Sequence, residues 1–109
     1  MKVELLYFAG CPTYELALSR LQEALRESGV DVPVEMIEVN SVEQAQALRF
    51  LGSPSIRINR LDVERTARER TSYGLTCRMY RTQSGLEGSP SVELIRTAIS
   101  EALKAERKA

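Results

Sequence analysis

The chain has 109 residues, 43% of them hydrophobic and 28% charged, which is typical of one soluble globular domain spanning 1–109. Its 15 basic and 15 acidic side chains cancel, so net charge gives no general attraction to nucleic acid or anionic lipid, and we expect neither as a partner. There is no apolar run near the ~18 residues of a membrane span, no signal-peptide pattern and too few cysteines (two) for a disulfide scaffold, so we expect a cytoplasmic protein.

The sequence contains no histidine, and this absence restricts its chemistry more than any other feature of the composition. It removes histidine general bases, Cys-His pairs and histidine metal ligands. We expect no cofactor and no resident metal. The arginines between positions 57 and 81 are interleaved with Asp62, Glu64 and Glu69. We interpret this stretch as a solvated face, with an anion or nucleic-acid site as the alternative.

The N-terminal third predicts a strand followed by a helix. Residues 3–8 form a nearly continuous apolar run, as in a buried central strand, and Ala9-Gly10 ends it. Cys11 stands at the expected N-cap and Pro12 at the first helical position. A stripe at three- and four-residue spacing continues to Gly29, which is expected to end the helix: Ala17, Leu18, Leu21, Ala24 and Leu25.

A second strand and helix follow, at 34–39 and 41–51. Ser41 and Gln44 have the spacing of a capping box, and Gly52 is expected to end the helix. This β-α-β-α order favours a parallel pair of strands.

The remaining segments predict two strands and a last helix. In "SPSIRIN", Ile56 and Ile58 alternate with polar residues after Pro54, which fits the start of a strand. Residues 60–74 show no convincing periodicity. "LTCRMYRT" predicts a fourth strand, antiparallel to the third, with Leu75, Cys77 and Met79 on one face and Tyr80 with its hydroxyl at an edge. "SGLEGSP" is a turn, Pro90 opens the last helix, and the final "KAERKA" is expected to fray. The apolar stripe of that helix is Val92, Ile95, Ala98, Ile99, Ala102 and Leu103.

The order β-α-β-α-β-β-α, with "GCPTY" after the first strand and "GSPSIRIN" at the third, resembles the thioredoxin-like superfamily, and most closely its compact glutaredoxin-like members. The resemblance covers nearly the whole chain. It implies an α/β thioredoxin-like fold with a mixed four-stranded sheet and helices on both faces. It also implies that Cys11 is the nucleophilic thiol and Pro54 a cis residue. Tyr14 replaces the second cysteine of dithiol members, so the chain is similar to the monothiol ones. The substrate-binding residues implied are Pro12, Thr13, Tyr14, Ser53, Pro54, Ser55 and Gly85.

Cys11 is expected to be a partly exposed thiol whose pKa the helix N-terminus lowers. The alternative is a small buried hydrophobe or a plain N-cap. Pro54 in the cis form would keep main-chain groups of Ser53 and Ser55 open to the extended backbone of a partner; a trans proline at a strand start is the alternative. Tyr14 is expected beside the thiol, without an acid-base role.

Cys77 is interpreted first as a core residue of the predicted fourth strand. The alternative is a thiol that resolves an adduct on Cys11. An expected separation of roughly 10 Å exceeds the ~7 Å between Cα atoms that a disulfide allows, so a direct bond requires residues 60–76 to rearrange or a different strand register.

Two functions remain open from the sequence. The first is a monothiol redox protein whose Cys11 forms a mixed disulfide with a protein or a low-molecular-weight thiol. The second is a non-enzymatic binding module for a peptide along Pro54 or for a soft thiophilic metal. The physiological substrate, the reductant and the oligomeric state do not follow from the residues.

Overall fold

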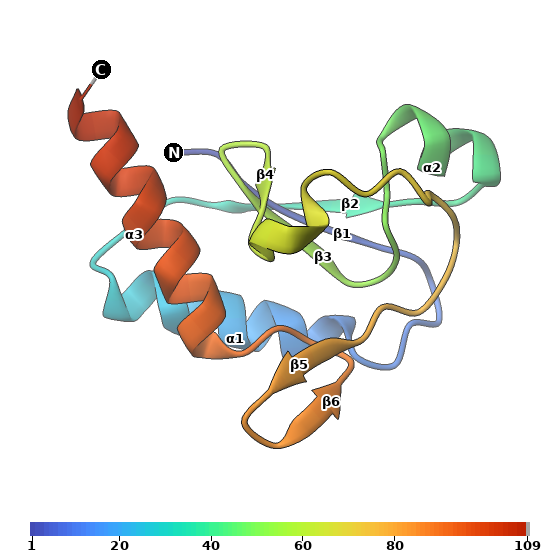
Figure 1. Ribbon diagram of the computed structural model, residues 1–109, viewed down its shortest axis with the longest axis horizontal. Helices are drawn as coiled ribbons and strands as arrows, with labels where there is room; N and C mark the ends of the chain where they lie inside the picture. The colour runs from blue at the N-terminus through green and yellow to red at the C-terminus, as the bar shows by residue number, and fades with distance from the viewer. Residues whose placement is uncertain (109) are drawn as a thin grey trace.

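A four-stranded mixed sheet organises the chain in the computed structural model, which describes residues 1–108 (Figure 1). The strand order is β2-β1-β3-β4, and a separate two-stranded hairpin, β5-β6, precedes the last helix. The protein is therefore a mixed α/β structure. Along the described residues, no helix combines the length and the apolar character needed to span a bilayer.

The first strand and helix form where the sequence predicts them. Strand β1 (Val3–Tyr7) is buried over its first four residues and pairs in parallel with β2 (Val34–Glu38), as expected for β-α-β order. Helix α1 (Tyr14–Glu27) ends before Gly29, which adopts φ 69°, and the Val30 amide donates to the Leu25 carbonyl at 2.9 Å. This closing pattern is a Schellman motif, which explains the glycine.

The start of α1 differs from the prediction that Cys11 is the N-cap. Thr13 occupies that position, because its φ of −117° and ψ of 2° are non-helical while its carbonyl accepts from the Ala17 amide at 3.0 Å. Phe8 to Cys11 instead close a separate turn, in which the Cys11 amide donates to the Phe8 carbonyl at 3.2 Å and Gly10 adopts φ 88°. Cys11 thus precedes the helix by one turn of irregular chain.

Helix α2 (Val42–Ala47) has the predicted cap but ends early. The Ser41 hydroxyl accepts from the Gln44 amide at 3.1 Å, and the Gln44 side chain accepts from the Asn40 amide at 2.6 Å. The helix ends at Ala47, so the prediction that Gly52 terminates it is wrong. Gly52 has φ 128° and lies against a later segment: a Cβ there would be 3.0 Å from the Thr76 carbonyl oxygen.

Strand β3 (Ser55–Ile58) runs antiparallel to β1 and follows a cis Ser53–Pro54 bond, so the expected cis proline is present at the strand start. The predicted fourth strand is wrong. Residues 59 and 60, at φ 51° and 70°, form a two-residue turn that returns β4 (Leu61–Asp62) onto β3. Strand β4 therefore occupies the edge of β3 at which residues 75–82 were predicted to pair.

Only part of that later segment is a strand. Strand β5 (Tyr80–Thr82) pairs with β6 (Gly85–Glu87), not with β3, and a short 3-10 helix, η1 (Arg65–Ala67), lies in the stretch that showed no periodicity. The hairpin projects below the sheet in Figure 1.

The burial of residues 75–80 is opposite to the prediction. Leu75, Cys77 and Met79 are exposed, whereas Arg78 and Tyr80 are buried. The Arg78 guanidinium is buried because it bonds to the carboxylates of Asp62 and Glu64. Neighbouring side chains of an extended segment point to opposite sides, so Cys77 is exposed and is not a core residue. The Tyr80 hydroxyl donates to the Pro54 carbonyl at 2.6 Å and does not stand at an edge.

Helix α3 (Val92–Lys108) packs with α1 on one face of the sheet, and α2 lies on the other. Alternation along β1 fixes this arrangement, because Val3 and Leu5 belong to the core under α1 and α3 while Leu6 packs with Ala45 of α2. The Ser91 hydroxyl caps α3 by accepting from the Leu94 amide at 3.1 Å. The helix continues to Lys108, the last described residue, and so includes the segment from residue 104 where we expected fraying.

Candidate active-site thiol

Cys11 lies at the carboxyl end of β1, in the turn that leads to α1, and its sulfur is surrounded by hydrogen-bonding groups. Its Sγ is 3.6 Å from the Thr13 hydroxyl oxygen. It also accepts from the backbone N–H groups of Thr13 and Tyr14 and from the Ser53 hydroxyl. The Ser53 oxygen in turn accepts from the Phe8 amide at 3.3 Å, which holds this hydroxyl at the end of β1.

These contacts lower the pKa of the Cys11 thiol below that of an ordinary cysteine. Burial is the largest single influence and raises it, but the hydrogen bonds from Ser53, Thr13 and Tyr14 together outweigh burial. Donors that point at a sulfur stabilise the thiolate more than the thiol. The groups that lower the pKa of Cys11 are the Ser53 hydroxyl and groups of Thr13 and Tyr14 at the N-terminus of α1, while Cys11 itself precedes the N-cap.

The exposure of the thiol differs from the expectation. Cys11 is only 4% exposed, not partly exposed, because Ser53 and Thr13 enclose the sulfur. Neither Cys11 nor Cys77 takes part in a disulfide.

The segment beside the cis proline is occupied by the chain itself. The Ser53 amide donates to the Thr76 carbonyl at 2.8 Å, and the Ser53 carbonyl accepts from the Arg78 amide at 2.9 Å. The prediction that the main-chain groups of Ser53 stay open to a partner is therefore wrong. These two hydrogen bonds form a parallel bridge between Ser53 and the 76–78 segment, which occupies the position expected for a partner's backbone.

Cys77 is the residue directly opposite Ser53 in this bridge, and it is exposed. The backbone hydrogen bonds of Ser53 go to Thr76 and Arg78, on either side of Cys77, while its side chain lies beside Cys11. Cys77 is therefore next to Ser53 in the fold, although the sequence predicted it in a fourth strand paired with the third.

The other predicted site residues divide into two groups. Pro12 is exposed in the thiol turn, and Tyr14 stacks on Tyr7 with ring centroids 4.5 Å apart. Desolvation, followed by the neighbouring Glu15 carboxylate, raises the pKa of Tyr14, so the phenol stays neutral at physiological pH. The Ser55 hydroxyl is engaged elsewhere: it donates to the Gly52 carbonyl at 2.6 Å.

Gly85 lies in the exposed β5-β6 hairpin with open space around it, whereas a different glycine touches the thiol turn. A Cβ on Gly88 would stand 2.6 Å from the Thr13 methyl carbon and 2.8 Å from its hydroxyl oxygen. The motif "SGLEGSP" contains both glycines, and only the tertiary contact distinguishes them.

Sequence reasoning also missed a buried polar cluster behind the cis proline. Arg78 donates to Asp62 at 2.7 and 2.9 Å, to Glu64 at 3.1 Å and to the Ser55 hydroxyl at 3.0 Å. Burial acts to lower the pKa of Arg78, but the Asp62 partner more than offsets it and the net shift is upward. This cluster anchors the 76–78 segment on Ser53. The sequence did not predict it, because nothing near Arg78 in the chain indicates that its side chain is buried.

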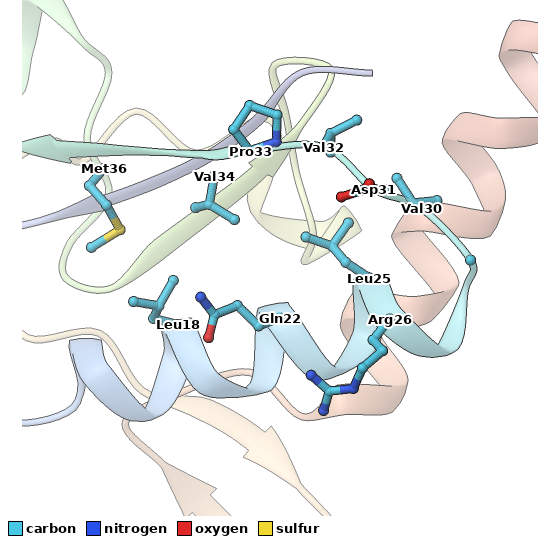
Figure 2. Close-up of a pocket in the computed structure, with 11 residues that line it drawn as sticks. Leu18, Gln22, Leu25, Arg26, Val30, Asp31, Val32, Pro33, Val34 and Met36 are labelled. Atoms are coloured by element: carbon cyan, nitrogen blue, oxygen red, sulfur yellow. The ribbon is translucent and has the colours of Figure 1, made fainter.

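Two hollows open on the surface of the domain. One of about 210 Å³ opens beside Phe8 and Ala9, in the thiol turn, and Leu75 closes its other side. A second, of about 670 Å³, lies between α1 and the free edge of β2, where Leu18, Val34 and Met36 face one another (Figure 2). None of the predicted site residues lines either hollow.

Fold and site together define an α/β domain with one activated, buried thiol at the carboxyl end of its central strand, held by a serine that precedes a cis proline. Comparison with known proteins gives no match: no family model, curated protein or solved structure shows significant similarity to this chain.

Proposed function

We propose that the chain is a thioredoxin-like monothiol redox protein whose Cys11 forms a mixed disulfide with a thiol-containing partner. The assignment to the thioredoxin-like superfamily is supported by the strand order β2-β1-β3-β4, by the parallel β1-β2 pair and by a cis proline before β3. It is also supported by the position of the thiol in the turn after β1.

One observation carries the proposal: four donors converge on a single sulfur. The Ser53 hydroxyl, the Thr13 hydroxyl and the backbone N–H groups of Thr13 and Tyr14 all reach Cys11. A buried cysteine with a purely structural role needs no such donors, and burial alone would raise its pKa. A donor cluster that lowers the pKa instead is what a nucleophilic thiolate requires.

The reaction is a thiol transfer in two steps. In the first, the Cys11 thiolate attacks one sulfur of a disulfide RS–SR′. A Cys11–SR bond forms, the RS–SR′ bond breaks, and R′S⁻ leaves and takes a proton from solvent. In the second, an external thiolate attacks RS on the mixed disulfide, which forms a new RS disulfide and returns Cys11 to the thiolate. The electrons come from the external thiol.

The small exposed area of Cys11 bears on the choice of substrate. Cys11 is only 4% exposed, so a low-molecular-weight disulfide or adduct reaches its sulfur more easily than a folded protein does. Because residue 14 is a tyrosine and not a second cysteine, the turn contains no other thiol that could resolve the adduct. Resolution then falls to an external thiol, and Cys77, across Ser53, is the alternative resolver within the chain.

The binding-module alternative has weaker support. A peptide along Pro54 would need the main-chain groups of Ser53, which Thr76 and Arg78 occupy. For a soft metal, no group of three cysteine, aspartate or glutamate side chains within residues 1–108 is arranged to hold an ion. We therefore retain the redox function.

Alkylation of Cys11 against pH tests the central claim, with a small reagent because the thiol is buried. In a Cys77→Ser background we expect an apparent pKa clearly below the ~8.5 of free cysteine. Ser53→Ala removes a donor and should raise that pKa, whereas Ser84→Ala, an exposed serine of the hairpin, should leave it unchanged. An apparent pKa at or above ~8.5 in the parent would remove the proposal.

Mass spectrometry after exposure to a small disulfide identifies the resolver. The wild type should carry one mixed-disulfide adduct on Cys11, and Cys11→Ser should carry none there. A Cys11–Cys77 bond in place of the adduct would assign resolution to Cys77. Absence of any adduct on Cys11 at every disulfide concentration would contradict thiol transfer.

A further inference from the structure

Five arginines and a tyrosine surround a small hollow on the α2 side of the sheet, away from the thiol. The hollow, of about 170 Å³, lies where the end of α2, the β3-β4 turn and the segment after η1 meet. We call it the arginine pocket, and it is lined by Arg49, Arg57, Arg60, Arg68, Arg70 and Tyr73. The sequence analysis interpreted residues 57–81 as a solvated face, with an anion or nucleic-acid site as the alternative; the fold gathers four arginines of that stretch with Arg49 at one place.

The positive charge of the pocket is only partly compensated. Asp62, the one acidic residue that lines it, is already bonded twice to Arg78. Arg68 pairs with Glu101 at 2.9 Å and Arg70 with Glu64 at 3.7 Å. Among the described residues, Arg49, Arg57 and Arg60 have no carboxylate oxygen within 4 Å.

Arg57 is the innermost of these three and is half-buried. One of its nitrogens donates to the carbonyls of Leu48 and Arg49 at 2.7 and 2.8 Å. Burial lowers its pKa, and Arg78 adds to the effect, while Glu4 and Asp62, its neighbours across the strands, oppose it. The net shift is downward because burial outweighs the effect of the two carboxylates.

The other two arginines occupy backbone positions that favour glycine. Arg49 follows α2 and adopts φ 55°. It occupies the position that Gly29 has after α1, because the Phe50 amide donates to the Ala45 carbonyl at 2.8 Å in the same closing motif. Arg60 is the second residue of the β3-β4 turn at φ 70°, where glycine is the common choice. Side chains in this left-handed region are held at a cost in stability, and such outliers gather at functional sites.

Both strained arginines line the same pocket, and this coincidence points to a ligand. A guanidinium offers several N–H donors in a planar fork that matches a phosphate or a carboxylate. Two uncompensated arginines beside a third, half-buried one suit a group with more than one negative charge. The volume of about 170 Å³ is below the ~300 Å³ at which drug-sized pockets begin, so it suits the anionic group and not a whole cofactor.

We propose that the arginine pocket is a binding site for phosphoryl groups, taken either as free phosphate or pyrophosphate or as the phosphate of a small ester. Arg49 and Arg60 are the residues that bind it, with Arg57 at the inner end. The site is independent of the proposed thiol chemistry, and Cys11→Ser leaves it unchanged.

The test uses the intact chain, titrated calorimetrically with phosphate, pyrophosphate and glycerol 3-phosphate at constant ionic strength set by sodium chloride. We expect saturable binding of at least one of them. Arg49→Gly and Arg60→Gly should each weaken it by about tenfold, because each removes a charged hydrogen-bond donor. The same two variants should melt a few degrees higher than the parent in the absence of ligand, because glycine relieves the positive φ.

Weaker binding together with a higher melting temperature distinguishes a ligand-binding arginine from a structural one, because loss of a structural arginine would lower the melting temperature. Arg81→Gln, which changes an exposed arginine of the β5-β6 hairpin, should alter neither quantity. Preference for glycerol 3-phosphate over phosphate would support the site and assign it to esters; the reverse would support it and assign it to free phosphate. Equal response to chloride and all three anions, or unchanged affinity in both glycine variants, would overturn the proposal.

Discussion

Replacing Arg78 by methionine tests the buried cluster that anchors the 76–78 segment. Methionine has a similar length and no charge, so the change removes the guanidinium while filling most of its space. It leaves Asp62, which is 7% exposed, without the two hydrogen bonds that Arg78 donates to it. It also frees the segment that carries Cys77 opposite Ser53.

The magnitude follows from what Asp62 retains. Removing one partner of a buried ion pair costs about 3–5 kcal/mol, because a charge stays buried without compensation. Here Asp62 keeps a hydrogen bond from the Glu64 amide at 2.8 Å, and the Arg78 Nε had no partner in the first place. Both facts place the loss at the lower end, about 3 kcal/mol, which for a domain of this size lowers the melting temperature by more than ~10 °C.

Urea unfolding of four proteins measures this: the parent, Arg78→Met, Asp62→Asn and the double variant. In the double variant no buried charge is left on Asp62, so it should lose less stability than Arg78→Met alone. A loss below about 1 kcal/mol for Arg78→Met, or a double variant less stable than Arg78→Met, would refute the reasoning.

Two further predictions concern stability. Hydrogen bonds from Arg68 and Arg65 lower the pKa of Glu101 from 4.5 to about 2. The contribution of the Glu101 carboxylate to stability is therefore present above pH 4.5 and is lost as the pH falls toward 2. Acid unfolding of Glu101→Gln should show a shallower dependence in that interval, and an unchanged slope would contradict the ion pairs. Gly88→Ala should destabilise by about 1–3 kcal/mol, because its Cβ would overlap Thr13, while Gly74→Ala, which meets open space, should not. Thermal unfolding compares the two alanine variants, and equal melting temperatures would contradict the contact.

The local parts of the fold were predictable because each depends on neighbours in the chain. The apolar run of β1, the stripe of α1 with Gly29 after it, the Ser41 cap of α2 and the apolar face of α3 all carry their signal within a few residues. The thiol turn and the proline before β3 belong to the same group. These elements also fix the parallel β1-β2 pair, because a helix joins them.

The site was predictable only in part. Cys11, Thr13 and Ser53 come together as the resemblance to the thioredoxin-like superfamily implied, yet the burial of the thiol depends on side chains that meet across the fold. The resemblance implied Gly85, and nothing in "SGLEGSP" indicates that Gly88 is the glycine that touches Thr13.

Tertiary structure alone decided where the charged residues went. A fourth strand at 61–62 exists because a two-residue turn forms at Asn59-Arg60, although arginine is not the residue that such a turn favours. With that edge filled, residues 76–78 bind to Ser53, and Arg78 turns inward to Asp62 while Cys77 turns outward. The sequence by itself determined the first three strands, the stripes of α1 and α3 and the cap of α2, since these follow from local periodicity and capping. Which arginine is buried depends on partners distant in the chain, because a buried charge is stable only where the fold supplies its counter-charge, as Asp62 and Glu64 do for Arg78.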